Sequence, residues 1–231
     1  DWPNRWVAPA LAYRYELAAE GRAKLDLSYG DRPRNRFDLF LPEGAAKGLL
    51  VFVHGGYWLA TGRETWSHLA AGALARGWAV AMPSYTLAPV AGIPQITSEI
   101  VQAVGAVADR FAGPVVVTGH SAGGHLTAVA MSNPKVAGGL PISGLFDLEP
   151  IMHTTVNGAL GLDAAEARRL SPLLMAAPGG RLHAFTRHLD PRWRERTVHV
   201  VTDASGKDTI YVAGKKHHFT PPTFELVPRP P

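Results

Sequence analysis

The chain has 231 residues, of which 46% are hydrophobic and 18% are charged, a balance typical of a globular protein that excludes disordered and fibrous classes. This length fits a single domain covering residues 1–231, because α/β domains commonly reach this size undivided. The chain has no cysteine, which excludes disulfides and thiolate metal sites and favours a reducing compartment, so we expect a cytoplasmic protein.

The net charge is +4, and the excess of basic residues is concentrated late in the chain. These residues are interspersed with Val, Leu and Thr, and no recognisable nucleic-acid-binding module surrounds them. We therefore expect a solvated basic surface and no nucleic-acid partner. The longest apolar runs have the length of strands, so we expect no membrane span either.

The start of the chain predicts a helix followed by a hairpin. Residues 1–24 form an amphipathic segment with aromatic side chains that can dock on the body of the protein. Residues 25–29 and 36–41 alternate apolar and polar side chains, as half-exposed strands do, and a polar turn joins them. This pattern predicts an antiparallel hairpin at a sheet edge.

After residue 48 the pattern changes to continuously apolar strands that alternate with helices. We expect buried strands at 48–53 and 78–82 and at the three valines 115–117, and further strands at 136–142 and 180–186. We expect helices at 66–76, 93–111 and 158–170, and an apolar helix that includes residues 126–131. This alternation predicts the α/β class, with a mostly parallel, doubly wound sheet, right-handed crossovers and no large lid domain. Residues 220–231 are a proline-rich tail.

The residues Gly119-His120-Ser121-Ala122-Gly123 form a Gly-x-Ser-x-Gly motif between a buried strand and an apolar helix. In such a nucleophile elbow, a strained strand-to-helix turn holds one hydroxyl clear of the sheet. The flanking glycines let the chain double back, and the helix N-terminus favours a developing oxyanion. The motif therefore predicts Ser121 as a catalytic nucleophile, and the strand and helix around it argue against a chance match.

A second motif, His54-Gly55-Gly56-Tyr57-Trp58, follows directly after the strand predicted at 48–53. Two glycines at the end of a strand let backbone N–H groups face a substrate. We expect N–H groups of Gly55, Gly56 or Tyr57 to form an oxyanion hole together with the N–H of Ala122. A plain glycine turn is the alternative interpretation.

Four side chains are expected to line the substrate pocket beside these motifs. Tyr57 and Trp58 lie at the predicted pocket wall, where packing is an equally good interpretation. His125 follows the nucleophile on the same helix, and its position favours packing or pocket lining over the role of base. Phe146 completes the set.

A serine hydroxyl needs a base that accepts its proton, and the chain order Ser, acid, His predicts a late histidine. His218 follows a predicted strand and a glycine turn and precedes an aromatic residue, so we prefer it over its neighbour His217. The two histidines could instead bind a metal, but no third ligand is evident. We therefore expect no metal and no cofactor.

The acid of the triad is predicted at Asp190. It lies just after the strand predicted at 180–186 and leaves room for an intervening segment before the histidine. Asp203 and Asp208 are the alternatives. Each of the three could also be a solvated surface charge.

The chain resembles α/β hydrolases, and within them the kynurenine formamidase (arylformamidase)-like branch. The resemblance runs from about residue 25 to 186 and rests on His54-Gly55-Gly56-Tyr57-Trp58, Gly119-His120-Ser121-Ala122-Gly123-Gly124-His125-Leu126, Pro141-Ile142-Ser143-Gly144-Leu145-Phe146-Asp147-Leu148, Ser171-Pro172-Leu173 and His217-His218-Phe219. It implies a nucleophile at Ser121, a base at His218, an acid near Asp190, and hydrolysis of aryl formamides or small esters through an acyl-enzyme.

Two alternatives stand beside this function. One is a general carboxylesterase without a formamidase role, because the same apparatus cleaves small esters. The other is a hydrolase-fold protein that binds ligands without turnover, because the chain departs from the family pattern after Arg187. The expected partner is a small-molecule ester or amide, and a homodimer is compatible with the sequence.

Overall fold

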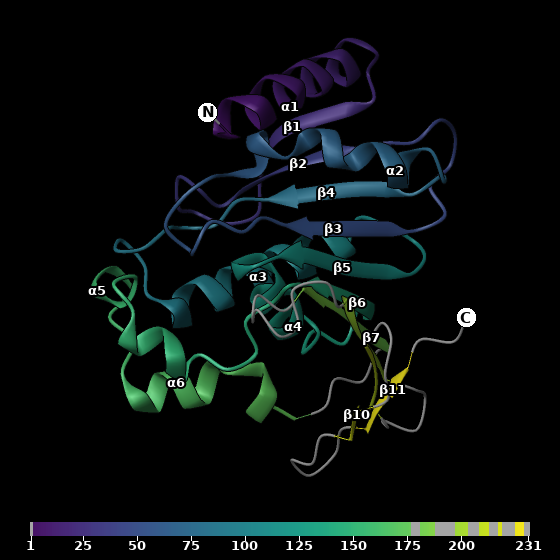
Figure 1. Cartoon of the computed structure of the whole chain (residues 1–231). Helices are drawn as coiled ribbons and strands as arrows, with labels where there is room; N and C mark the ends of the chain where they lie inside the picture. Colours follow the sequence, from purple (N-terminus) through teal and green to yellow (C-terminus); the bar gives the residue numbers. More distant parts are fainter. Residues whose placement is uncertain are drawn as a thin grey trace.

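The computed structural model describes the backbone of residues 2–176 and of five later strands between residues 181 and 228. Side chains are described for residues 5–176. The strands form one sheet in the order β1-β2-β4-β3-β5-β6-β7-β8-β9-β11-β10 (Figure 1).

The N-terminal part consists of helix α1 (Trp2–Ala19) and strands β1 (Ala23–Ser28) and β2 (Arg36–Phe40). The two strands pair antiparallel, and β1 is an edge strand of the sheet. The predicted hairpin is therefore confirmed. Helix α1 contacts β1 and the segments that follow β3, so it docks on the body as expected.

Five strands form the parallel part of the sheet, in the order β4, β3, β5, β6 and β7. Their bounds are β3 Leu49–Val53, β4 Ala79–Pro83, β5 Val115–His120, β6 Val136–Ile142 and β7 Arg181–Arg187. Since β2 pairs antiparallel with β4, the sheet is mostly parallel in its centre and antiparallel at its N-terminal edge, as predicted.

Beyond β7 the sheet continues with short strands. They are β8 Thr197–Thr202, β9 Asp208–Val212, β10 His217–His218 and β11 Glu225–Pro228. Strand β8 pairs antiparallel with β7 and with β9, whereas β11 pairs parallel with β9 and antiparallel with β10. Strand β10 is thus the second edge of the sheet.

The helices match the predicted positions with two differences. The described helical segments after α1 are η1 Arg63–Thr65, η2 Ser67–Ala70, α2 Ala71–Leu74, α3 Ile93–Ala108, α4 Ala122–Ala130, η3 Glu149–His153, α5 Asn157–Leu160, α6 Ala164–Leu170 and η4 Pro172–Leu174. The helix predicted at 66–76 is a 3-10 turn followed by one α-helical turn. The helix predicted at 158–170 is interrupted, because Gly161 adopts φ +65° at the end of α5 and the Asp163 side chain caps the start of α6.

The core has two layers, one on each face of the sheet. Val51 of β3 belongs to the layer that contains α3 and α4, whereas its neighbour Phe52 belongs to the layer beneath α1 and α2. This alternation explains why the central strands are continuously apolar, since successive side chains point to opposite, covered faces. Helix α3 buries Ile96, Ile100 and Val104 at helical spacing, as predicted.

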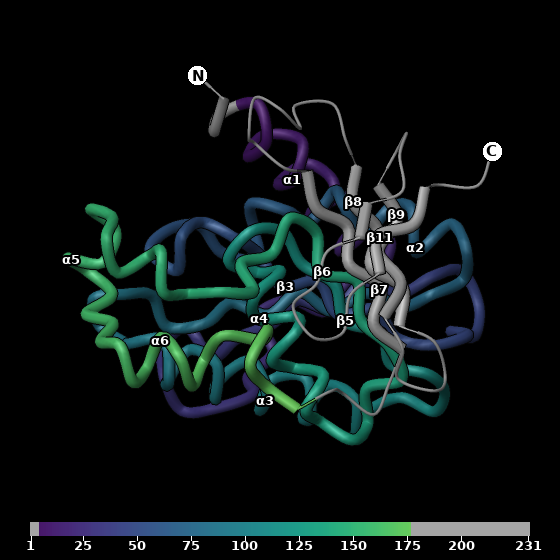
Figure 2. Tube along the Cα trace, turned by 60° about the horizontal axis from the view of Figure 1, so that its bottom comes forward, coloured from purple at the N-terminus to yellow at the C-terminus, as the bar shows by residue number. Residues whose placement is uncertain are grey.

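The parallel strands end on the side of the molecule where α5 and α6 lie. Figures 1 and 2 show these two helices at the left, toward the arrowheads of β3, β4 and β5 in Figure 1. In open α/β sheets ligands bind beyond the carboxyl ends of the strands. Among the described helices, none combines the length and the apolar character that a membrane span requires.

Candidate active site

Ser121 lies on the sharp turn between the end of β5 and the start of α4. Its backbone has φ +58° and ψ −119°, a combination that L-residues adopt only when the surroundings hold them. The Ser121 N–H donates to the carbonyl oxygen of Ile142 at 2.9 Å, and its own carbonyl oxygen accepts from the N–H of Gly124 at 2.8 Å. The predicted strained turn is therefore present, with a partly exposed serine at its tip.

The glycines of the elbow are required by close backbone packing. A Cβ on Gly119 would lie 2.5 Å from the carbonyl oxygen of Val53, and a Cβ on Gly123 would lie 2.7 Å from that of His54. Real Cβ atoms essentially never come so close to other heavy atoms. The elbow is thus pressed against the end of β3, where the second motif begins.

The glycine loop after β3 borders the serine. A Cβ on Gly55 would lie 2.5 Å from the carbonyl oxygen of His120 and 3.4 Å from Cβ of Ser121. The next three residues, Gly56, Tyr57 and Trp58, all have positive φ, at +106°, +56° and +59°. The loop therefore begins beside the serine, on the side where backbone N–H groups could serve as oxyanion donors.

His54 is buried and neutral. Its ring stacks on Tyr85 with 4.3 Å between ring centroids and 9° between the planes. Burial lowers its pKa from 6.5 to about 4. Its Nδ1 lies 2.9 Å from the carbonyl oxygen of Gly55 and 3.1 Å from Oγ1 of Thr61. These contacts make His54 a support of the glycine loop.

The four expected pocket residues fall into two pairs. Tyr57 is 62% exposed and Phe146 is half-buried, so both have surface that solvent reaches. Trp58 and His125 are fully buried and meet edge to face with 5.4 Å between their ring centroids. The structure places this second pair in the core instead of on an open pocket wall.

His125 has a packing role in this structure. Its Nε2 lies 2.9 Å from the carbonyl oxygen of Leu170 at the end of α6, and burial lowers its pKa from 6.5 to about 4. It therefore ties α4 to α6 as a neutral ring, consistent with the expectation that it is not the base.

The expected acid and base come from the last part of the chain. Asp190 and Asp203 lie outside the described residues, and for Asp208, His217 and His218 only the backbone is described, in β9 and β10. Five strands separate β10 from β5 in the sheet order. Neighbouring strands are about 4.8 Å apart, so six spacings in an open sheet exceed the reach of a histidine side chain. This strand order does not bring His218 to Ser121.

No group of three metal-ligating side chains occurs in the part of the chain whose side chains are described. The described site therefore consists of a strained serine, a helix N-terminus and a glycine loop. Such a set can supply a nucleophile and backbone donors for an oxyanion.

A family model described as alpha/beta hydrolase fold matches residues 50–200 of this chain, which include both motifs. The chain belongs to this family. The fold class and the resemblance to α/β hydrolases are thereby confirmed.

Curated relatives of this α/β hydrolase include two groups of enzymes. Kynurenine formamidase of Danio rerio is 30% identical over 160 residues, which are 64% of this chain and 55% of the relative. Kynurenine formamidase of Salmo salar is 29% identical over 193 residues, 74% of this chain and 66% of the relative. Isoprenylcysteine alpha-carbonyl methylesterase of Arabidopsis thaliana is 34% identical over 130 residues, 52% of this chain and 30% of the relative. The chain thus matches between about half and two thirds of the length of these formamidases.

Solved structures agree with the fold. A candidate thioesterase from Silicibacter sp. is 47% identical with a TM-score of 0.77, and the alignment covers 80% of this chain and 73% of that protein. An esterase from the archaeon Pyrobaculum calidifontis is 21% identical with a TM-score of 0.61, covering 75% of this chain and 69% of that one, and supports the fold alone.

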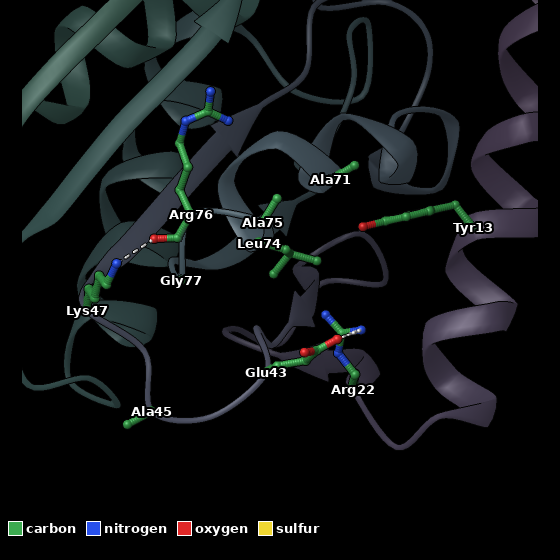
Figure 3. Close-up of a pocket in the computed structure, with 10 residues that line it drawn as sticks. All are labelled: Tyr13, Arg22, Glu43, Ala45, Lys47, Ala71, Leu74, Ala75, Arg76 and Gly77. Carbon is green, nitrogen blue, oxygen red and sulfur yellow. Dashed lines mark hydrogen bonds and ion pairs between the residues drawn. The ribbon is translucent and has the colours of Figure 1, made fainter.

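A hollow of about 580 Å³ lies at the other end of the α/β-hydrolase sheet, between α1, α2 and the segment before β3 (Figure 3). Its charged groups are already engaged: Arg22 lies 3.7 Å from Glu43, and the Lys47 ammonium donates to the carbonyl oxygen of Arg76 at 3.1 Å. Lys47 and Gly77 precede β3 and β4, so the hollow lies at the amino ends of these strands. Ser121 follows the carboxyl end of β5, which runs parallel to β3, so the hollow is separate from the site.

Three residues that support the hydrolase site were not indicated by sequence reasoning. The hydroxyl of Thr61 donates to the carbonyl oxygen of Gly55 at 3.0 Å, and the hydroxyl of Tyr85 donates to that of His54 at 3.0 Å. Arg34 donates hydrogen bonds to the backbone carbonyl oxygens of Tyr85 and of Thr61. They come from three separate loops and carry no motif, so only the fold reveals them.

Proposed function

We propose that this chain is a serine hydrolase that cleaves an aryl formamide or a small carboxylester through an acyl-enzyme. The observation that carries the proposal is the position of Ser121, at φ +58° on the elbow and beside the backbone of Gly55. A serine held in a strained turn at a helix N-terminus, facing a glycine loop, is the arrangement that acyl-transfer chemistry needs.

In the proposed reaction, Oγ of Ser121 attacks the substrate carbonyl carbon while a base accepts the hydroxyl proton. The carbonyl oxygen becomes an oxyanion, which accepts hydrogen bonds from the N–H of Ala122 and of Gly56. The N–H of Ala122 belongs to the first turn of α4 and has no partner within its helix. The C–N or C–O bond then breaks, the amine or alcohol leaves with the proton, and water hydrolyses the acyl-serine to release the acid.

The relatives support two substrate classes. The formamidases of Danio rerio and Salmo salar favour an aryl formamide, whose formyl group is the smallest acyl group. The methylesterase of Arabidopsis thaliana favours carboxylesters. Tyr57 and Phe146, the expected pocket residues with exposed surface, offer aromatic contacts to the leaving group in both cases.

A second candidate function is a hydrolase-fold protein that binds carbonyl compounds without turnover. The strand order favours it, because five strands lie between β5 and the strand that holds His218. In the catalytic proposal His218 is the base and Asp190 the acid. This proposal requires the active protein to hold its last strands in another arrangement than the order given above, so that His218 reaches Ser121.

Hydrolysis of p-nitrophenyl acetate and of N-formylkynurenine by purified wild-type protein and Ser121→Ala separates these functions. The catalytic proposal predicts turnover that Ser121→Ala abolishes. Formamide turnover comparable to ester cleavage supports the formamidase assignment, whereas ester cleavage alone supports a carboxylesterase. Equal, background rates for folded wild-type protein and Ser121→Ala support the binding protein.

His218→Ala and His217→Ala identify the base. Loss of turnover in the His218 variant alone supports the assigned base. Loss in the His217 variant alone moves the role to its neighbour.

A further inference from the structure

Two successive backbone carbonyl groups of residues 54 and 55 each accept a hydrogen bond from a side-chain hydroxyl. The Tyr85 hydroxyl donates to the carbonyl oxygen of His54 at 3.0 Å, and the Thr61 hydroxyl donates to that of Gly55 at 3.0 Å. Nδ1 of His54 also lies 2.9 Å from the oxygen of Gly55. The loop beside Ser121 is thus anchored at two neighbouring peptide groups.

Holding a carbonyl group also fixes the direction of the N–H of the same peptide group. Both peptide bonds in question are trans, and in a trans peptide the C=O and N–H point in opposite directions. Tyr85 therefore sets the direction of the Gly55 N–H, and Thr61 sets that of the Gly56 N–H. These are two of the donors expected in the oxyanion hole.

Thr61 cannot hold its position by local preference. It is a β-branched residue with φ +68°, a conformation that costs on the order of 1 kcal/mol or more and persists only when neighbours impose it. Arg34 supplies that constraint, since its Nη2 donates to the carbonyl oxygen of Thr61 at 2.6 Å. The same guanidinium donates from Nε to the carbonyl oxygen of Tyr85 at 2.8 Å.

One half-buried arginine therefore links both hydroxyl-bearing residues, and each of them holds one peptide group of the loop. We propose that Thr61 is a positioning residue of the oxyanion hole that aims the N–H of Gly56, with Arg34 fixing Thr61 and Tyr85 relative to each other. This inference rests on the proposed function for its catalytic consequence, and on the hydrogen bonds of Thr61, Tyr85 and Arg34 for its structural part.

The decisive variants are Thr61→Val and Thr61→Ser. Valine keeps the β-branched shape and the backbone preference of threonine but removes the hydroxyl, whereas serine keeps the hydroxyl and loses only a methyl group. Misdirecting one oxyanion donor should lower kcat by about 10- to 100-fold. KM should change by less than about threefold, because the donor acts mainly on the transition state. Thr61→Ser should retain kcat within about threefold of wild type.

A purely structural role gives a different pattern. If Thr61 only stabilises the fold, Thr61→Val lowers the melting temperature while the remaining folded enzyme keeps the wild-type kcat. That result, or a kcat that falls equally in the serine variant, overturns the inference.

Amide hydrogen exchange tests the structural part separately from turnover. Residues 55–57 should exchange faster in Thr61→Val than in wild type and Thr61→Ser, while amides of β5 stay unchanged. Unchanged exchange at residues 55–57 overturns the inference even in an active enzyme. Absent turnover in wild-type protein together with faster exchange in Thr61→Val refutes the proposed function but leaves the positioning of the loop intact.

Discussion

Gly123 of the elbow helix and His54 at the end of β3 approach so closely that a Cβ on Gly123 would lie 2.7 Å from the carbonyl oxygen of His54. The same Cβ would come still closer to the carbonyl oxygen of Val53. The nucleophile turn and the glycine loop are therefore one packed unit, in which the backbone of each sets the position of the other.

We expect Gly123→Ala to lower the free energy of unfolding by about 3 kcal/mol, because overpacking against backbone cannot be relieved by a side-chain rotation. Gly158→Ala is the matched control: a Cβ there meets no atom within 4 Å, and its φ is not in the left-handed region. Urea denaturation followed by tryptophan fluorescence measures both variants. Equal stabilities would show that the elbow does not press on β3.

Stability should depend on pH through two buried histidines. Burial lowers the pKa values of His54 and His125 from 6.5 to about 4. The unfolded chain therefore binds a proton at each histidine below about pH 6.5, whereas the folded protein binds it only below about pH 4. The free energy of unfolding is therefore highest above pH 6.5 and falls as the pH drops toward 4. Each histidine contributes about 3 kcal/mol to this loss.

Denaturation of wild type and His125→Gln between about pH 7.5 and pH 4.5 measures this dependence. Glutamine cannot titrate and can still donate toward the carbonyl oxygen of Leu170. We expect a shallower loss of stability with falling pH in His125→Gln. Identical slopes in the two proteins would contradict the burial of a neutral imidazole at this position.

A buried carboxylate ties the first helix to the sheet. Asp38 is fully buried and pairs with Nε of Arg14 from α1 at 3.0 Å and with Nε of Arg63 at 3.1 Å. Asp38→Asn removes the buried charge partner of two guanidinium groups and leaves them only the exposed carboxylate of Asp26, so we expect a loss of about 3 kcal/mol. It should also expose α1 to proteolysis.

Asp26→Asn is the control for Asp38→Asn. Asp26 also contacts Arg14 and Arg63, but its side chain is 64% exposed, so its loss should cost less than about 1 kcal/mol. Denaturation midpoints and the rate of tryptic cleavage within residues 2–19 give the comparison. Equal losses in both variants would show that burial does not decide the strength of these pairs.

The neighbours Tyr57 and Trp58 should respond differently to truncation. Tyr57 is 62% exposed, so Tyr57→Ala should change stability by less than about 0.5 kcal/mol and raise KM for aryl substrates. Trp58 is fully buried, so Trp58→Ala should cost about 3 to 5 kcal/mol. An unchanged KM in Tyr57→Ala would remove Tyr57 from the substrate pocket.

The sequence predicts most of the sheet because its central strands are apolar on both faces, as Val51 and Phe52 show. It predicts the elbow because only glycine fits at positions such as 119 and 123, so the constraint is visible in the residue type. It misses the break at Gly161, since a glycine within a helical pattern does not reveal whether its φ is positive.

The supports of the site are less accessible to sequence reasoning. Thr61, Tyr85 and Arg34 act through hydrogen bonds to backbone carbonyl groups of distant residues, so their contribution depends on tertiary contacts alone. The burial of Trp58 likewise depends on tertiary contacts, such as its edge-to-face contact with His125.

The central claim is that Ser121 is an activated nucleophile. Incubation of the folded protein with a fluorophosphonate, followed by intact-mass and peptide mass spectrometry, tests it directly. We predict one adduct per chain, located on Ser121 and absent from Ser121→Ala. A folded wild-type protein that forms no adduct, or one that is modified at another residue, would contradict the account.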